Sequence, residues 1–113
     1  MTLKELRDAL LNVCSSVAYA AFETGVDPPF ICYRGTGNND FLADDENYQP
    51  IGTFDIELYT NGKEPGLESD LEAALKDLEL VWDKTEAYVK AEKLVEVVYS
   101  VSILPSESDD SSA

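Results

Sequence analysis

The sequence predicts a single α+β domain in which two helices pack on an antiparallel or mixed sheet, in the order α-β-β-α-β-β. Three observations predict this fold. Apolar residues recur at helical spacing in two segments, other segments are apolar or alternate between apolar and polar residues, and clusters of Gly, Pro and Asn separate them. The 113 residues suffice for one modest core, and the apolar share of 44% is ordinary for a folded chain.

The first helix is expected over residues 3–23. Thr2 and Glu5 have the spacing of a capping box, and apolar residues follow with helical periodicity. Gly25, followed by a pair of prolines, should end the helix.

The second helix is expected over residues 65–79. Pro65 suits the first helical position, because its missing N–H would have no intrahelical partner there. Glu68 and Asp70 follow in the first turn, where the helix dipole favours acidic side chains.

Four strands are expected, over residues 30–34, 50–60, 81–89 and 93–104. The first two should form one antiparallel hairpin and the last two another. In the second strand, Asp55 and Glu57 alternate with apolar residues, which places them on the solvent side. The third strand alternates poorly, because it places charged and aromatic residues on one face: Trp82, Lys84, Glu86 and Tyr88. The predicted core contains Leu6, Leu10, Val13, Val17, Phe54, Ile56, Leu58, Leu71, Leu75 and Leu78.

The domain is expected to span residues 1–105, and residues 106–113 to form an acidic tail that is disordered when free. The first residues include acids and no long apolar stretch, so we expect no signal peptide. No apolar run approaches the ~18 residues that a membrane helix needs.

Composition argues against an enzyme and against nucleic-acid binding. The 8 basic and 23 acidic residues give a net charge of −15, which repels nucleic acid and anionic membranes. There is no histidine, the commonest general base near neutral pH. Cys14 and Cys32 lack a histidine partner for catalysis and cannot form a zinc site alone. We expect them to be buried, reduced thiols, and we expect no cofactor.

A long acidic loop precedes the second strand. Its acids do not have the spacing of an EF-hand, so we expect them to face a partner rather than a metal ion. Loops of this length are uncommon in a small domain unless they have a function. The strand over 93–104 is long and apolar, and an exposed edge of that kind tends to be covered by a partner. The candidate assembly contacts are therefore Asp40, Phe41, Asp44, Asp45, Glu46, Tyr48, Val97 and Tyr99.

Several short segments resemble one family of small phage proteins. These segments are Phe54-Asp55-Ile56-Glu57-Leu58-Tyr59-Thr60, Lys63-Glu64-Pro65, Leu71-Glu72-Ala73-Ala74-Leu75, Thr85-Glu86-Ala87-Tyr88, Glu92-Lys93-Leu94 and Glu96-Val97-Val98-Tyr99. The family resembled is that of the tail terminators, or tail-to-head joining proteins, of long-tailed phages and prophages. The likeness extends from Leu3 to Leu104, and the acidic tail lies outside it.

The resemblance implies a structural protein of the virion that forms a hexameric ring at the junction of tail and head, after assembly in the host bacterial cytoplasm. Its partners would be other copies of the chain, the tail-tube protein and the head connector protein. DNA would pass the negatively charged lumen without specific binding. Two alternatives stay open: another phage ring component, such as a head-completion or tail-tube protein, and an acidic DNA mimic that inhibits a DNA-binding enzyme.

Overall fold

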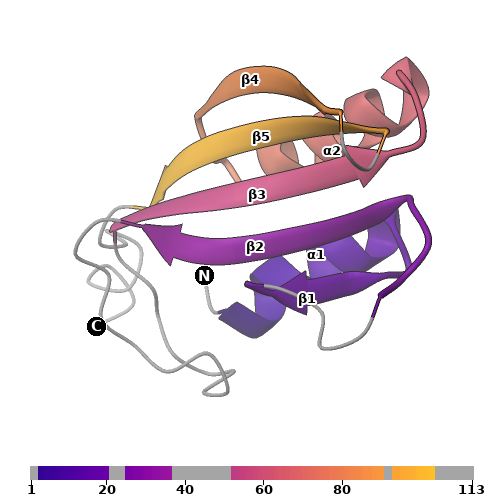
Figure 1. Cartoon of the computed structure of the whole chain (residues 1–113). Helices are drawn as coiled ribbons and strands as arrows, with labels where there is room; N and C mark the ends of the chain where they lie inside the picture. Colours follow the sequence, from indigo (N-terminus) through magenta and orange to yellow (C-terminus); the bar gives the residue numbers. More distant parts are fainter. Residues whose placement is uncertain (1–2, 21–24, 37–51, 91–92, 104–113) are drawn as a thin grey trace, which may run out of the picture.

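The domain is a five-stranded mixed sheet with two helices on one face (Figure 1). The computed structural model describes residues 3–20, 25–36, 52–90 and 93–103. The elements along the chain are α1 (Leu3–Val13), β1 (Val17–Tyr19), β2 (Phe30–Thr36), β3 (Gly52–Thr60), α2 (Pro65–Asp77), β4 (Trp82–Val89) and β5 (Leu94–Ile103). The strand order is β1-β2-β3-β5-β4, which makes β1 and β4 the two edges. The predicted α+β class is confirmed.

Both predicted hairpins are present. β2 pairs with β3, and β4 pairs with β5, each in antiparallel orientation. The two hairpins join where β3 pairs with β5 along nine residues, from Gly52 opposite Ile103 to Thr60 opposite Val95. The long, apolar β5 is therefore an interior strand with a neighbour on each side.

The predicted first helix, over residues 3–23, was too long. α1 ends at Val13, and residues 17–19 form the edge strand β1 instead, parallel to β2. Two backbone hydrogen bonds hold β1, from the N–H of Ile31 to the Ser16 carbonyl (2.9 Å) and from the N–H of Ala20 to the Tyr33 carbonyl (2.7 Å). Pairing with β2 outweighed the helical periodicity of this segment because its Val and Tyr residues also suit a strand.

The core lies between the sheet and the two helices. Of the predicted core residues, seven are buried: Leu6, Leu10, Phe54, Ile56, Leu58, Leu71 and Leu75. Val13, Val17 and Leu78 are partly buried and pack against this cluster. β5 contributes Val97, Tyr99 and Val101, which meet Leu58, Ile56 and Phe54 across the β3–β5 pairing.

Candidate interaction surface

The predicted assembly contacts fall into two groups. The loop residues Asp40, Phe41, Asp44, Asp45, Glu46 and Tyr48 lie outside the described residues. Val97 and Tyr99 lie on β5, and their side chains are buried against the helices. The prediction for these two residues rested on β5 being an exposed edge, and that premise was wrong. β5 lies between β3 and β4, so it has no free side to offer a partner.

The exposed edge of the sheet is β4. Six of its eight residues are exposed, and the first and last are partly exposed. No described strand lies on its outer side, and Figure 1 shows it at the end of the sheet beyond β5. Tyr88 is 60% exposed, and Val81, immediately before the strand, is 82% exposed. This strand therefore combines a free backbone edge with apolar side chains in solvent.

The direction of the backbone groups on β4 follows from the pairing of the other strands. Ile31 and Tyr33 make the bonds to β1, so the odd-numbered residues of β2 turn their N–H and C=O groups toward β1. These groups alternate in direction along a strand and face each other in hydrogen-bonded pairs. The three antiparallel registers determine these directions in each following strand. In β4, four residues turn their N–H and C=O groups away from β5: Trp82, Lys84, Glu86 and Tyr88.

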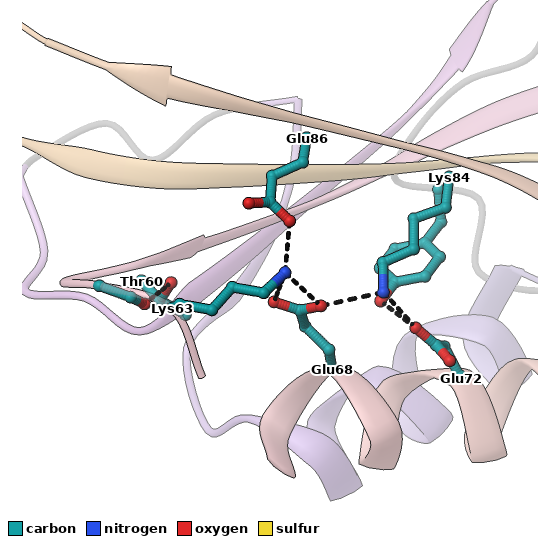
Figure 2. A network of polar contacts seen from close by, with 8 residues as sticks. Thr60, Lys63, Glu68, Glu72, Lys84 and Glu86 are labelled. Atoms are coloured by element: carbon teal, nitrogen blue, oxygen red, sulfur yellow. Dashed lines mark hydrogen bonds and ion pairs between the residues drawn. The ribbon is translucent and has the colours of Figure 1, made fainter. Parts of the chain in front are cut away.

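A cluster of charged side chains attaches β4 to α2 (Figure 2). Lys84 lies 2.9 Å from Glu68 Oε1 and 2.7 Å from Glu72 Oε2. Lys63, from the turn before α2, lies 2.9 Å from Glu68 Oε2 and also contacts Glu86 on β4. Glu68 was predicted to complement the helix dipole. It is also the buried acid on which two lysines converge.

The electrostatics of this cluster favour its charged forms. Burial raises the pKa of Glu68, but the hydrogen bonds from Lys63 and Lys84 outweigh it, so the pKa is below its usual value. The hydrogen bond from Lys84 is the main cause that lowers the pKa of Glu72, with a second from the Tyr99 hydroxyl (2.8 Å). The same contacts raise the pKa of Lys84. The cluster thus fixes β4 against the helix while its outer edge stays free.

No helix of the described part of the chain lies on the opposite face of the sheet, yet one acid there is buried. The Glu57 side chain lies 3.1 Å from Arg34 Nη2 and accepts a hydrogen bond from the Tyr59 hydroxyl (3.3 Å). Tyr59 also donates to Glu96 (2.8 Å). Burial raises the pKa of Glu57. Glu57 was predicted to face solvent. It is on the predicted face, but neighbouring long side chains cover it.

Potential metal ligands, two thiols and one groove are the other features of the described residues that bear on chemistry. Among the described residues, no group of three or more Asp, Glu, His or Cys side chains is placed to hold a metal ion. Cys14 and Cys32 are free, buried thiols, and burial raises the pKa of Cys32, which disfavours its reactive thiolate. A groove of about 410 Å³ between α1 and α2 carries Asp70 and Asp77 on its wall.

Neither helix in the described part of the chain is long and apolar enough to cross a membrane.

The sequence did contain a signal for the β4 edge. The sequence of this strand departs from the simple alternation of apolar and polar residues, because charged and aromatic residues share one of its faces. Charged residues are one of the means by which proteins protect an edge strand. Chain order could not show which strand would be the edge, because that depends on β3 pairing with β5 rather than with β4.

The chain matches no protein-family model, and no curated protein is significantly similar to it.

Proposed function

We propose that this chain is a structural subunit of a phage virion, a tail terminator or tail-to-head joining protein that forms a ring on the end of the tail tube and docks it to the head connector. The observation that carries the proposal is the free β4 edge, with apolar side chains in solvent beside it. A domain that works by contact with other chains needs such a surface.

The placement of the phage-like segments supports the proposal. Apart from Glu92, which lies outside the described residues, they lie on β3, at the start and in the second half of α2, on β4 and on β5, which are neighbouring parts of the fold. This part includes the free edge and the charged cluster that holds it to α2.

The charge of the chain also supports a ring around DNA. A net charge of −15 opposes the binding of phosphates, so a ring of such subunits would let DNA pass through without retaining it. The proposed site of action is the junction of tail and head in the virion.

Negative-stain electron microscopy of the purified protein mixed with tail tubes tests the proposal. The expected image shows a ring at one end of each tube, and tubes with the ring no longer grow when tube protein is added. Binding along the tube wall, or only to heads, would indicate a different virion component. Binding to neither, with tight association with a basic DNA-binding enzyme that weakens as salt rises, would support the DNA mimic instead.

A further inference from the structure

The outer edge of β4 is complementary to itself when a second copy lies beside it in antiparallel orientation. We propose that two copies of this chain pair through β4 with Thr85 on the twofold axis, so that the sheets of the two subunits become continuous. The proposal needs only the residues of β4 and Val81 immediately before it, and it does not rest on the function proposed above.

Charge complementarity selects this pairing. With Thr85 opposite Thr85, Lys84 lies opposite Glu86 of the second copy, and Glu86 lies opposite its Lys84. Opposite charges on facing residues stabilise antiparallel strands, and like charges destabilise them. In the monomer these two side chains already lie at the edge, where Lys84 contacts Glu72 and Glu86 contacts Lys63.

The exposed apolar residues find apolar partners in the same pairing. Tyr88, which is 60% exposed, lies opposite Trp82 of the second copy. Val81, which is 82% exposed, lies opposite Val89, a partly buried residue at the far end of β4. Two of the three large hydrophobic side chains exposed in the described part of the chain would thus be covered. The third, Leu11, lies on α1.

Other pairings within β4 bring like charges together. An axis at Lys84 places the two copies of that lysine opposite each other, and an axis at Glu86 does the same for two glutamates. An axis at residue 83 places two copies of Asp83 face to face, and an axis at residue 87 places Lys84 opposite Lys90 of the second copy. Of the axes at residues 83 to 87, which pair most of β4, only the axis at residue 85 avoids such contacts, so charge favours this register among them.

The backbone directions permit this register. Trp82, Lys84, Glu86 and Tyr88 turn their N–H and C=O groups outward, and in the proposed register they lie opposite one another. Each such pair exchanges two hydrogen bonds, which gives about eight across the contact. A twofold axis perpendicular to the sheet keeps the helices of both copies on the same face.

This contact is isologous, so it closes after two copies and cannot by itself build a ring. The pairing therefore describes the chain free in solution, and the dimer would have to open before the β4 edge could contact a neighbour in the proposed ring. The net charge of −15 on each copy opposes pairing at low salt, so the association should be measured at physiological ionic strength, where the screening length is about 8 Å.

Cysteine crosslinking tests the register directly. In the proposed pairing the two Thr85 residues form a pair without mutual hydrogen bonds, whose Cα atoms are about 4.5 Å apart, within the range for a disulfide. Thr85→Cys should therefore form a covalent dimer on mild oxidation. Ala87→Cys is the matched control, because residue 87 is exposed on the same strand face. In the proposed register the two copies of residue 87 would lie four residues apart, about 13 Å along the strand, which is too far for a disulfide.

Sedimentation over a concentration series tests the contact without crosslinking. Wild-type protein should convert from monomer to dimer, and Tyr88→Lys and Val81→Lys should each raise the dissociation constant about tenfold or more. Leu11→Lys replaces an exposed apolar residue far from the edge and should leave the constant unchanged. The circular dichroism spectra of all variants should match that of wild type.

Three results would overturn the proposal. One is a wild-type protein that stays monomeric throughout the concentration series. Another is equal crosslinking of Thr85→Cys and Ala87→Cys, which would mean random collision or another register. The third is an association that survives Tyr88→Lys but is lost in Leu11→Lys, which would place the contact on α1.

Discussion

Two buried glutamates show how the same side chain takes opposite electrostatic roles in one small domain. Glu57 lies on the helix-free face with one arginine beside it, and burial is the main influence on its pKa. Glu68 lies on α2 with two lysines beside it, and their hydrogen bonds outweigh burial. The folded environment therefore shifts the pKa of Glu57 upward and that of Glu68 downward, and the two acids should affect the pH dependence of stability in opposite directions.

Replacing Glu57 by Gln should raise the melting temperature near neutral pH. Its folded-state pKa is above the usual value of 4.5, so the stability that Glu57 contributes at low pH is lost as the pH rises through the folded-state pKa. Gln remains neutral and avoids that loss. The ion pair that Glu57 forms with the exposed Arg34 contributes little to stability, so its removal costs little. Thermal unfolding from pH 4 to pH 8 measures the difference in melting temperature between wild type and variant. Asp70→Asn, at an exposed position, is the control for the change in net charge. A variant less stable than wild type near neutral pH would show that the ion pair dominates.

Replacing Glu68 by Gln should lower the free energy of unfolding near neutral pH by roughly 1–3 kcal/mol, because two lysines lose a charged acceptor. The folded-state pKa of Glu68 is lowered, so its contribution is present above the usual value of 4.5 and is lost as the pH falls through the folded-state pKa. The wild type and the variant should therefore converge in acid. Urea titrations at several pH values, with Asp77→Asn as the control on the same helix, measure the difference. A difference that did not change with pH would point to packing rather than charge.

At the scale of elements, segments with local sequence signals of their own were predicted, and the strand that depends on a distant partner was not. α2 was predicted over residues 65–79 and is observed over Pro65–Asp77, because a proline start and an apolar stripe define it. β3 and β5 were predicted within two residues at each end. β1 was missed, since a three-residue strand depends on pairing with a distant segment rather than on a pattern of its own. The order of strands in the sheet was not predictable for the same reason.

Leu75 tests the packing of α2 against the sheet. Its side chain is fully buried among residues of the sheet and of α1. Leu75→Ala should therefore lower the free energy of unfolding by roughly 2–5 kcal/mol, as expected when a buried leucine leaves a cavity. Chemical denaturation measures the loss, and Ala73→Ser, at an exposed position of the same helix, should change little. A loss well under ~1 kcal/mol at Leu75 would contradict the observed packing.

At the scale of the whole molecule, the fold separates a closed core from surfaces suited to contact. The helices cover one face of the sheet, and the charged cluster closes the corner between α2 and β4, while the outer side of β4 stays free. Sequence alone predicted that the chain works by contact but placed part of the contact on β5. The expectation that β5 would be an exposed edge was wrong, because a long apolar strand is equally suited to the middle of a sheet.

The segment of residues 37–50, which the sequence predicts to be a loop, provides a prediction at this scale. We expect deletion of residues 39–44 to leave the domain folded, because it removes no residue of the described core. If the loop contacts neighbours in the proposed ring, cells producing the variant should accumulate full heads beside unjoined tails. Circular dichroism checks the fold, and electron microscopy of lysates counts joined particles. A folded variant with a normal number of joined, infectious particles would show that the loop is not an assembly element.

If a phage or prophage encodes the chain, as we propose, removal of the whole gene from that phage or prophage tests the proposed function most directly. The measurement is a count of joined particles, free heads and free tails in thin films of lysate, with the wild-type gene returned on a plasmid as the control. We expect full heads, unjoined tails of which some are overlong, and recovery of joined particles when the gene is returned. Normal numbers of joined, infectious particles without the gene would contradict it.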